Sequence, residues 1–188
     1  MSEHVILVTG PMGAGKTTAI QSLSEIEVVL TEAGNSERDV VDKPTTTVAL
    51  DYGEISLGPD EKVRLYGTPG QRRFDFMWTI LRARAQGMLL LVGNDGPDPV
   101  GTALAYLEDF IELYDRGGVV IGVTRSDLAA GPSLADFGAA LQAAHPGLVL
   151  PVFTVDPRSA SHMRMALMAL VVNMEMRAAY RTPTAVNA

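Results

Sequence analysis

Short apolar segments recur along this chain and alternate with longer amphipathic ones. The segments 88–92 (MLLLV) and 119–123 (VVIGV) are continuously apolar, which is typical of parallel strands buried on both faces. The segments too short for a helix, which predict strands, are 4–9, 47–57, 62–66, 88–92, 119–123 and 148–155. The longer segments, which predict helices, are 15–25, one that follows residue 71 and ends near 84, 99–114, 133–144 and 159–180.

The order of these segments predicts an α/β fold. A strand and a helix come first, then two strands joined by a Gly-Pro-Asp turn at 58–60, and then helices and strands in alternation. We expect a three-layer α/β/α sandwich around a mostly parallel six-stranded sheet with one antiparallel hairpin strand. Residues 1–181 are expected to form a single domain, followed by a frayed tail at 182–188.

Composition limits the expected cellular location of the protein and the classes of partner that it can bind. The 188 residues carry a formal net charge of −7, which disfavours nucleic acid and anionic lipid as partners. There is no cysteine, so disulfides and thiolate chemistry are excluded, and a reducing cytoplasm is the expected location. No signal peptide, membrane-spanning run or lipidation motif is evident, so we expect no direct membrane anchor.

The segment GPMGAGKT at 10–17 matches the P-loop pattern G-x-x-x-x-G-K-[ST] between a predicted strand and a predicted helix. Glycines allow successive backbone N–H groups to surround phosphate, and the helix N-terminus adds its positive dipole end. Lys16 is expected to reach the β- and γ-phosphates, and the Thr17 hydroxyl to bind Mg²⁺. A chance glycine-rich turn with an exposed lysine is the alternative. The predicted nucleotide-binding residues of this loop are Met12, Gly13, Ala14, Gly15, Lys16, Thr17 and Thr18.

Four further segments extend the pattern: PTTTVALDY at 44–52, YGTPGQ at 66–71, TRSD at 124–127 and VDPR at 155–158. In order and spacing, together with the P-loop, they resemble the Ras-like small GTPases. The branch they resemble is the bacterial one of gliding-motility Mgl-type and conservon-type GTPases. The resemblance implies a Ras-like P-loop NTPase fold that binds GTP or GDP with Mg²⁺.

The resemblance also assigns roles around the γ-phosphate. Thr47 would complete Mg²⁺ coordination, with Thr46 as its nearest rival and an ordinary strand start as the alternative. Gly70 would offer a backbone N–H to the γ-phosphate, and Gln71 would orient the attacking water, unless it merely decorates a turn. The implied catalytic residues are therefore Gln71, Lys16 and Gly70.

Gly67 departs from the pattern, because most small GTPases have an aspartate there that holds a Mg²⁺-bound water. Loss of such a group typically costs roughly 10–100-fold in metal affinity or activity. Mg²⁺ is then expected to bind weakly or to use another carboxylate, for which Asp51 is one candidate.

Two segments are assigned to the base. The resemblance implies that Asp127 accepts hydrogen bonds from guanine N1 and N2, with Thr124 and Arg125 beside it. A helix N-cap is the competing interpretation of Asp127. The last segment aligns Asp156, Pro157 and Arg158 with the S-A-K motif of small GTPases. Proline has no N–H to offer guanine O6, so the N–H of Asp156 or of Arg158 would have to replace it.

Together these features predict a slow GTPase that acts as a nucleotide-dependent switch on protein effectors or regulators. The resemblance suggests a roadblock-type activator or a sensor-kinase-like module as the partner. A nucleotide-gated scaffold with little hydrolysis is the first alternative, motivated by Met12, Gly67 and Pro157, and a small-metabolite kinase is the second. An intrinsic arginine finger, best placed at Arg73, competes with a solvated helix face.

Overall fold

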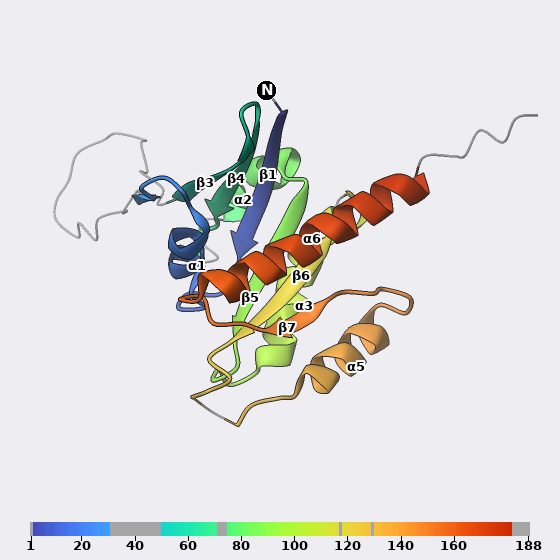
Figure 1. The fold of residues 1–188 in the computed structure, drawn as a ribbon. Helices are drawn as coiled ribbons and strands as arrows, with labels where there is room; N and C mark the ends of the chain where they lie inside the picture. Colours follow the sequence, from blue (N-terminus) through green and yellow to red (C-terminus); the bar gives the residue numbers. More distant parts are fainter. Residues whose placement is uncertain (1, 31–49, 71–74, 117, 129, 182–188) are drawn as a thin grey trace, which may run out of the picture.

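The computed structural model describes residues 2–30, 50–70, 75–116, 118–128 and 130–181. Within these residues the strands form one sheet in the order β2-β3-β4-β1-β5-β6-β7 (Figure 1). The six predicted strands are present, and a short edge strand, β2, joins them. The strands are β1 (Ser2–Thr9), β2 (Val29–Leu30), β3 (Asp51–Gly58), β4 (Glu61–Gly67), β5 (Gly87–Gly93), β6 (Val119–Thr124) and β7 (Val152–Thr154).

The sheet is mostly parallel, as the sequence predicts. β1 pairs in parallel with both β4 and β5, β5 pairs with β6, and β6 pairs with β7. β3 runs antiparallel to β4, and the short β2 runs antiparallel to β3. The carboxyl ends of the parallel strands therefore meet at one edge, where ligands bind in open α/β sheets. The fold class predicted from the sequence, an α/β sandwich typical of P-loop NTPases, is confirmed.

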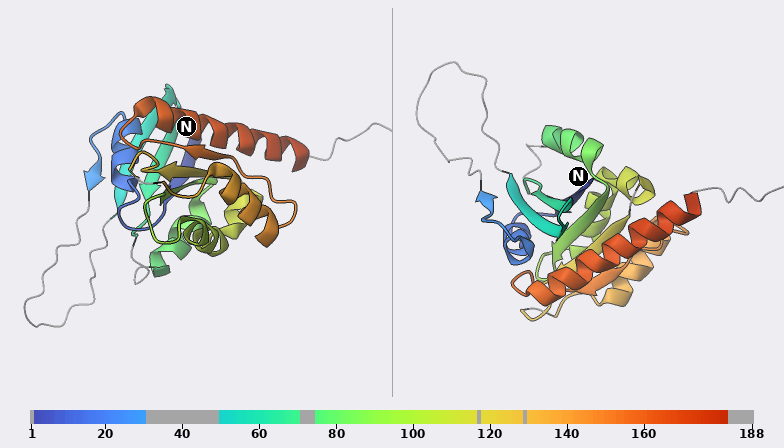
Figure 2. Two further views of the ribbon diagram at one scale, coloured as in Figure 1. Left: turned by 90° about the horizontal axis from the view of Figure 1, so that it is seen from below. Right: turned by 45° about the horizontal axis from the view of Figure 1, so that its top comes forward.

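Helices cover both faces of the sheet. Among the described residues they are α1 (Lys16–Leu23), α2 (Asp75–Arg84), α3 (Pro99–Asp109), α4 (Ile111–Arg116), α5 (Leu134–Ala144) and α6 (Ala160–Arg181). One core cluster joins the sheet to α1 and α6, and the other joins it to α2, α3, α4 and α5. Figure 2 shows α1 and α6 together on one side of the strands.

The predicted helix 99–114 is two helices, because Phe110 leaves helical geometry at φ −128° and ψ 22°. Its ring is fully buried and lies 5.1 Å from the ring of Trp78 on α2. The bend at Phe110 lets α4 turn toward the sheet, where Leu113 is also fully buried. The predicted strand 148–155 is shortened to Val152–Thr154.

The methionines that crowd the last helix divide between core and surface. Met163 is fully buried, and Met174 packs against the same core cluster. Met165, Met168 and Met176 are exposed. Only some of these methionines therefore pack in the core.

None of the described helices has both the length and the apolar character needed to cross a membrane. The expected cytoplasmic location stays a prediction.

Candidate functional site

The P-loop leaves β1 and enters α1 at the carboxyl edge of the sheet. Gly10, Gly13 and Gly15 have φ values of +138°, +80° and +96°, which L side chains rarely adopt. Gly10 also has no space for a side chain, since a Cβ there would lie 2.0 Å from the carbonyl oxygen of Leu91. α1 begins at Lys16 with no side-chain cap on its N-terminus. The loop therefore has the backbone that a phosphate cradle requires.

Lys16 lies inside this loop and is only 8% exposed, which excludes the alternative of a chance turn with an exposed lysine. Its Nζ donates to the carbonyl oxygens of Gly10 and Pro11, at 2.8 Å each. Burial lowers the pKa of Lys16 to about 8, and the nearby Asp51 carboxylate partly opposes that shift. Backbone carbonyls thus hold the ammonium group at the cradle.

Thr17, the next residue, contacts the sheet at the carboxylate of Asp51. Its hydroxyl donates to Oδ2 of Asp51 at 2.5 Å. Asp51 is the first residue of β3 and pairs across the antiparallel ladder with Gly67, the last residue of β4. The residue considered above as a substitute carboxylate therefore lies beside the predicted Mg²⁺ ligand.

The loop after β4 returns along the P-loop. Thr68 is buried, its N–H donates to the carbonyl of Val8, and its hydroxyl pairs with that of Thr9 at 2.7 Å. A Cβ at Gly70 would lie 2.7 Å from the Met12 nitrogen and 2.9 Å from Lys16 Nζ. Gly70 therefore lies directly against the P-loop, and its role at the γ-phosphate stays a prediction.

The end of β6 also contacts the P-loop. The fully buried Thr124 donates its hydroxyl to the carbonyl of Ala14 at 3.2 Å. Arg125 has a positive φ of 57° and donates from its guanidinium to the Gly13 carbonyl at 2.5 Å. It also pairs with Asp95 at 2.9 Å. Asp95 was missed at the sequence level, because no motif connects the loop after β5 to this arginine.

Asp127 lies in the exposed turn that follows Arg125. The helix N-cap interpretation is wrong, because Ser133 caps α5 through a capping box with Asp136. Asp127 is close enough to Arg158 to help raise the pKa of that guanidinium, although the larger cause is the hydrogen bond to Asp156. The loops after β6 and β7, both predicted to hold the base, are therefore close enough for their charges to interact.

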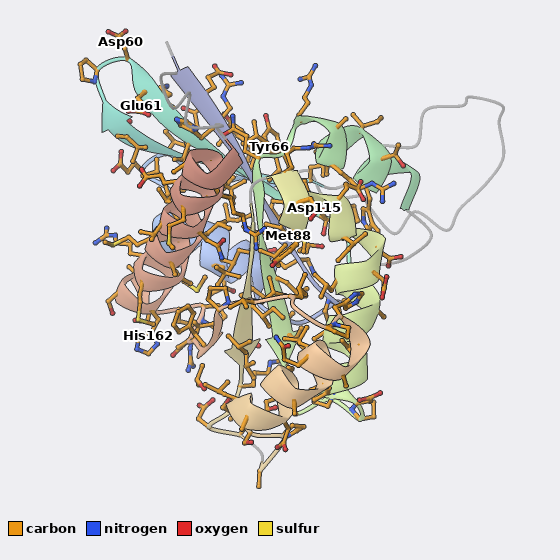
Figure 3. All side chains as sticks on the ribbon, turned by 90° about the vertical axis from the view of Figure 1, so that its right-hand side faces the viewer. Asp60, Glu61, Tyr66, Met88, Asp115 and His162 are labelled. Carbon is orange, nitrogen blue, oxygen red and sulfur yellow. The ribbon has the colours of Figure 1, made fainter. Side chains whose placement is uncertain are left out.

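The loop after β7 contacts the P-loop through Pro157, since a Cβ at Gly15 would lie 2.6 Å from its Cγ. The two N–H groups suggested as replacements are both engaged within the chain. That of Asp156 donates to Nδ1 of His162 at 3.2 Å, and that of Arg158 donates to the Asp156 carboxylate at 2.9 Å. His162 lies near the start of α6 (Figure 3). Base recognition by these N–H groups would need the loop to rearrange.

Some predicted positions are not described. Thr47 and its rival Thr46, Gln71, Arg73 and the tail 182–188 lie outside the described residues. Met12 lies on the loop and is 75% exposed, whereas Thr18 lies in the first turn of α1. Arg82 is the described arginine of α2 that comes next after Arg73 in the sequence. It donates to the carbonyl of Asp109 and pairs with Glu112, so it is held against α3 and α4.

Comparison with known proteins supports nucleotide binding. Residues 8–92 match the model of a family described as a conserved hypothetical ATP-binding protein. An uncharacterized protein of Methanocaldococcus jannaschii is 35% identical over 75 residues, which is 40% of this chain. The chain spans about two fifths of that relative's length, at 41%. The matched range contains the P-loop and Gly70.

The resemblance to bacterial Ras-like GTPases of the Mgl and conservon type is wrong, since these matches indicate an ATP-binding P-loop family. The physical reason is that a phosphate cradle serves ATP and GTP alike, so the P-loop supports either class. The small-metabolite kinase alternative gains no support from the matches. The matched range ends before Thr124, so the residues predicted to contact the base lie outside it.

Proposed function

We propose that this chain binds a guanine nucleoside triphosphate with Mg²⁺, hydrolyses it slowly, and acts as a nucleotide-dependent switch. The observation that carries the proposal is the convergence of three loops on one P-loop. The loop after β4 contacts it at Gly70, the loop after β6 at Thr124 and Arg125, and the loop after β7 at Pro157. Such a site has a phosphate end and a base end.

At the phosphate end, backbone N–H groups of the glycine loop and the N-terminus of α1 can receive the β- and γ-phosphates. Lys16 is already held at the loop and would exchange its carbonyl partners for phosphate oxygens. Gly70 lies within contact of Lys16 Nζ and Met12, so its backbone is positioned to sense the γ-phosphate. Gln71, beyond the described residues, is proposed to orient the attacking water.

The residues fit Mg²⁺, which prefers oxygen ligands. Thr17 and Asp51 bring a hydroxyl and a carboxylate oxygen within 2.5 Å of each other at the start of α1. Thr47 is proposed as a further ligand and lies outside the described residues. When bound, the cation would neutralise charge on the β- and γ-phosphate oxygens.

At the base end, Asp127 favours guanine. An ionised carboxylate only accepts hydrogen bonds, and guanine presents two neighbouring donors, N1–H and N2–H, where adenine has no matching pair. The stem of Arg125 passes close to Gly93, and its guanidinium donates to the Gly13 carbonyl of the P-loop. A guanidinium in this loop can stack on a base. Protein effectors or regulators that read the nucleotide state complete the proposal.

ATP is the second candidate ligand, because the family model that matches residues 8–92 carries an ATP-binding description. Hydrolysis separates the switch from a nucleotide-gated scaffold, which would bind the same ligand without turnover. A Gln71→Ala variant should lose turnover but keep binding if the chain is an enzyme, and should change neither if it is a scaffold.

The first experiment is displacement of a fluorescent GDP and, separately, a fluorescent ADP by GDP, GTP, ADP and ATP, each with and without Mg²⁺. Selective displacement by guanine nucleotides is expected. The Asp127→Ala variant should lose that selectivity by about 10²-fold or more, since a site built for a polar edge loses its discrimination with its acceptor. Asp115→Ala, an exposed carboxylate change on α4, should leave selectivity unchanged.

Equal displacement by ATP in the wild-type chain, or unchanged selectivity in Asp127→Ala, would overturn the guanine assignment. Absence of nucleotide binding under all conditions would overturn the proposal as a whole.

A further inference from the structure

We propose that Asp51 supplies the carboxylate that holds Mg²⁺ beside Thr17, and that Gly67 provides the space for it. This inference rests on the proposed function, because it concerns the metal that accompanies the nucleotide. The carboxylate then comes from β3, the antiparallel neighbour of β4, and not from β4 itself.

The backbone register places the two positions opposite each other. Asp51 opens β3 and pairs directly with Gly67 at the end of β4. Directly opposed residues of antiparallel strands carry their Cβ atoms about 4.5–5.5 Å apart on the same face of the sheet. A carboxylate at either position is therefore aimed at the same volume under the start of α1.

The side chain of Asp51 fills the place that a side chain at position 67 would take. A Cβ built at Gly67 would lie 2.9 Å from Asp51 Cβ, 3.1 Å from Asp51 Oδ2 and 3.0 Å from Ile20 Cδ1. Real Cβ atoms essentially never show the first of these distances. The two positions cannot both carry a side chain in this arrangement, so glycine at 67 goes with aspartate at 51.

α1 is held close enough to β3 for the contact with Thr17. Gly53 leaves so little room under α1 that a Cβ there would lie 2.8 Å from Ile20 Cγ2. The N–H of Glu25 donates to the Glu54 carbonyl at 2.8 Å, and the Glu54 N–H donates to Ser24 Oγ at 3.2 Å. These bonds attach the end of α1 to β3, which fixes the helix over Asp51.

The chemistry of the pair suits the cation. Thr17 is the P-loop position whose hydroxyl binds Mg²⁺, and its hydroxyl is 2.5 Å from Asp51 Oδ2. Mg²⁺ is usually bound by one or two carboxylates together with substrate phosphates, and it keeps several waters. Asp51 is the carboxylate that the described structure places next to this hydroxyl, either as a direct ligand or through a bound water.

The negative charge of Asp51 determines in which direction its removal should change nucleotide affinity. With Mg²⁺ present, the carboxylate supports nucleotide binding through the metal. Without Mg²⁺, it is a negative charge close to the phosphates, so its removal should leave affinity unchanged or increase it. A merely structural role of Asp51 would instead weaken binding equally in both conditions.

The experiment measures the affinity for fluorescent GDP, or for the preferred nucleotide, in excess Mg²⁺ and in excess EDTA. The ratio of the two affinities is the Mg²⁺ effect. In Asp51→Ala this ratio should fall by roughly 10–100-fold, the usual effect of losing a carboxylate that positions a metal. Asp51→Asn should behave likewise, and it keeps the side-chain volume if alanine impairs folding.

Asp60→Ala is the matched control, because it removes the same charge from the same hairpin at its exposed tip, at the end of β4 away from Gly67 (Figure 3). Its Mg²⁺ effect should equal that of the wild type. The double variant Asp51→Gly with Gly67→Asp moves the carboxylate across the strand pair without leaving two Cβ atoms 2.9 Å apart, and it should recover at least part of the Mg²⁺ effect. Gly67→Asp alone should not, since it meets the Asp51 side chain.

The outcomes separate the two proposals. Wild-type binding with a Mg²⁺ effect that persists unchanged in Asp51→Ala and Asp51→Asn would overturn the role of Asp51 and leave the proposed function standing. Equal loss of affinity with Mg²⁺ and with EDTA would also overturn it, in favour of a structural role. No nucleotide binding by the wild type would overturn the proposed function, and the inference with it.

Discussion

The buried lysine of the P-loop should make nucleotide binding depend on pH in a defined way. Lys16 is 8% exposed, and its burial lowers its pKa to about 8 in the free chain. Bound phosphates stabilise the ammonium form, so the pKa in the complex must be higher than in the free chain. Binding above neutral pH should therefore take up a proton from solution.

The magnitude follows from the fraction of Lys16 that is neutral before binding. With a free-state pKa of about 8, uptake should be about 0.1 proton at pH 7, about 0.5 at pH 8 and about 0.9 at pH 9. Affinity should be nearly constant below pH 8 and should fall by up to about tenfold per pH unit above it. The terminal phosphate, with a second pKa of about 6, is already ionised there and contributes little.

Isothermal titration calorimetry with a nucleoside diphosphate measures this uptake. Repeating the titration at pH 7, 8 and 9 in buffers of different ionisation enthalpy gives the number of protons bound. Lys16→Met should bind weakly with no proton uptake attributable to this position. Lys62→Met, a partly exposed lysine on β4 paired with Glu54, should keep the wild-type uptake.

Constant proton uptake between pH 7 and pH 9 would refute the reasoning, because it would mean that Lys16 is fully charged in the free chain. The carbonyls of Gly10 and Pro11 would then compensate for its burial completely.

Three stability predictions can be checked by chemical denaturation. Gly10→Ala should lower the free energy of unfolding by about 2–6 kcal/mol through overpacking and a strained positive φ, whereas Gly138→Ala on α5, with open space around it, should raise it by about 0.5–1 kcal/mol. Met163→Ala should lower it by about 2–5 kcal/mol, and the exposed Met168→Ala should change it by less than about 0.5 kcal/mol. Phe110→Ala should lower it by about 3–5 kcal/mol, because its ring is fully buried. A large loss in either control variant, or none in its partner, would contradict these assignments.

The architecture could be predicted because its strongest signals are local. The buried strands at 88–92 and 119–123 are continuous apolar runs with no helical period, and every residue in both runs is buried. The break at Phe110 could not be predicted, since apolar residues follow at Ile111 and Leu113 and neither glycine nor proline marks the bend. Tertiary packing against Trp78 decides that position.

The phosphate end of the site could also be predicted, because a P-loop is contiguous in sequence. The base end could not be settled in the same way. Its residues come from two separate loops, and a short T-R-S-D segment is compatible with more than one role. The structure excludes the helix N-cap role of Asp127, because Ser133 caps α5. It also shows that the N–H groups of Asp156 and Arg158 already donate hydrogen bonds within the chain. The resemblance to Ras-like GTPases was wrong because the P-loop, which ATP- and GTP-binding proteins share, was combined with short segments elsewhere in the chain. A P-loop does not determine what those segments do.

The most informative position is Gly67, where the sequence departs from the small-GTPase pattern. From the sequence, Gly67 indicates a missing carboxylate, and Asp51 is only one acidic residue sixteen positions earlier. Antiparallel pairing of β3 with β4 places these two residues opposite each other, and no local pattern shows that. A carboxylate can therefore move between neighbouring strands while its target volume stays the same, provided that the position it leaves becomes glycine. The same geometry implies that position 51 and position 67 must be exchanged together: either single change removes the carboxylate or overfills the space under α1, and only the paired change preserves both packing and charge.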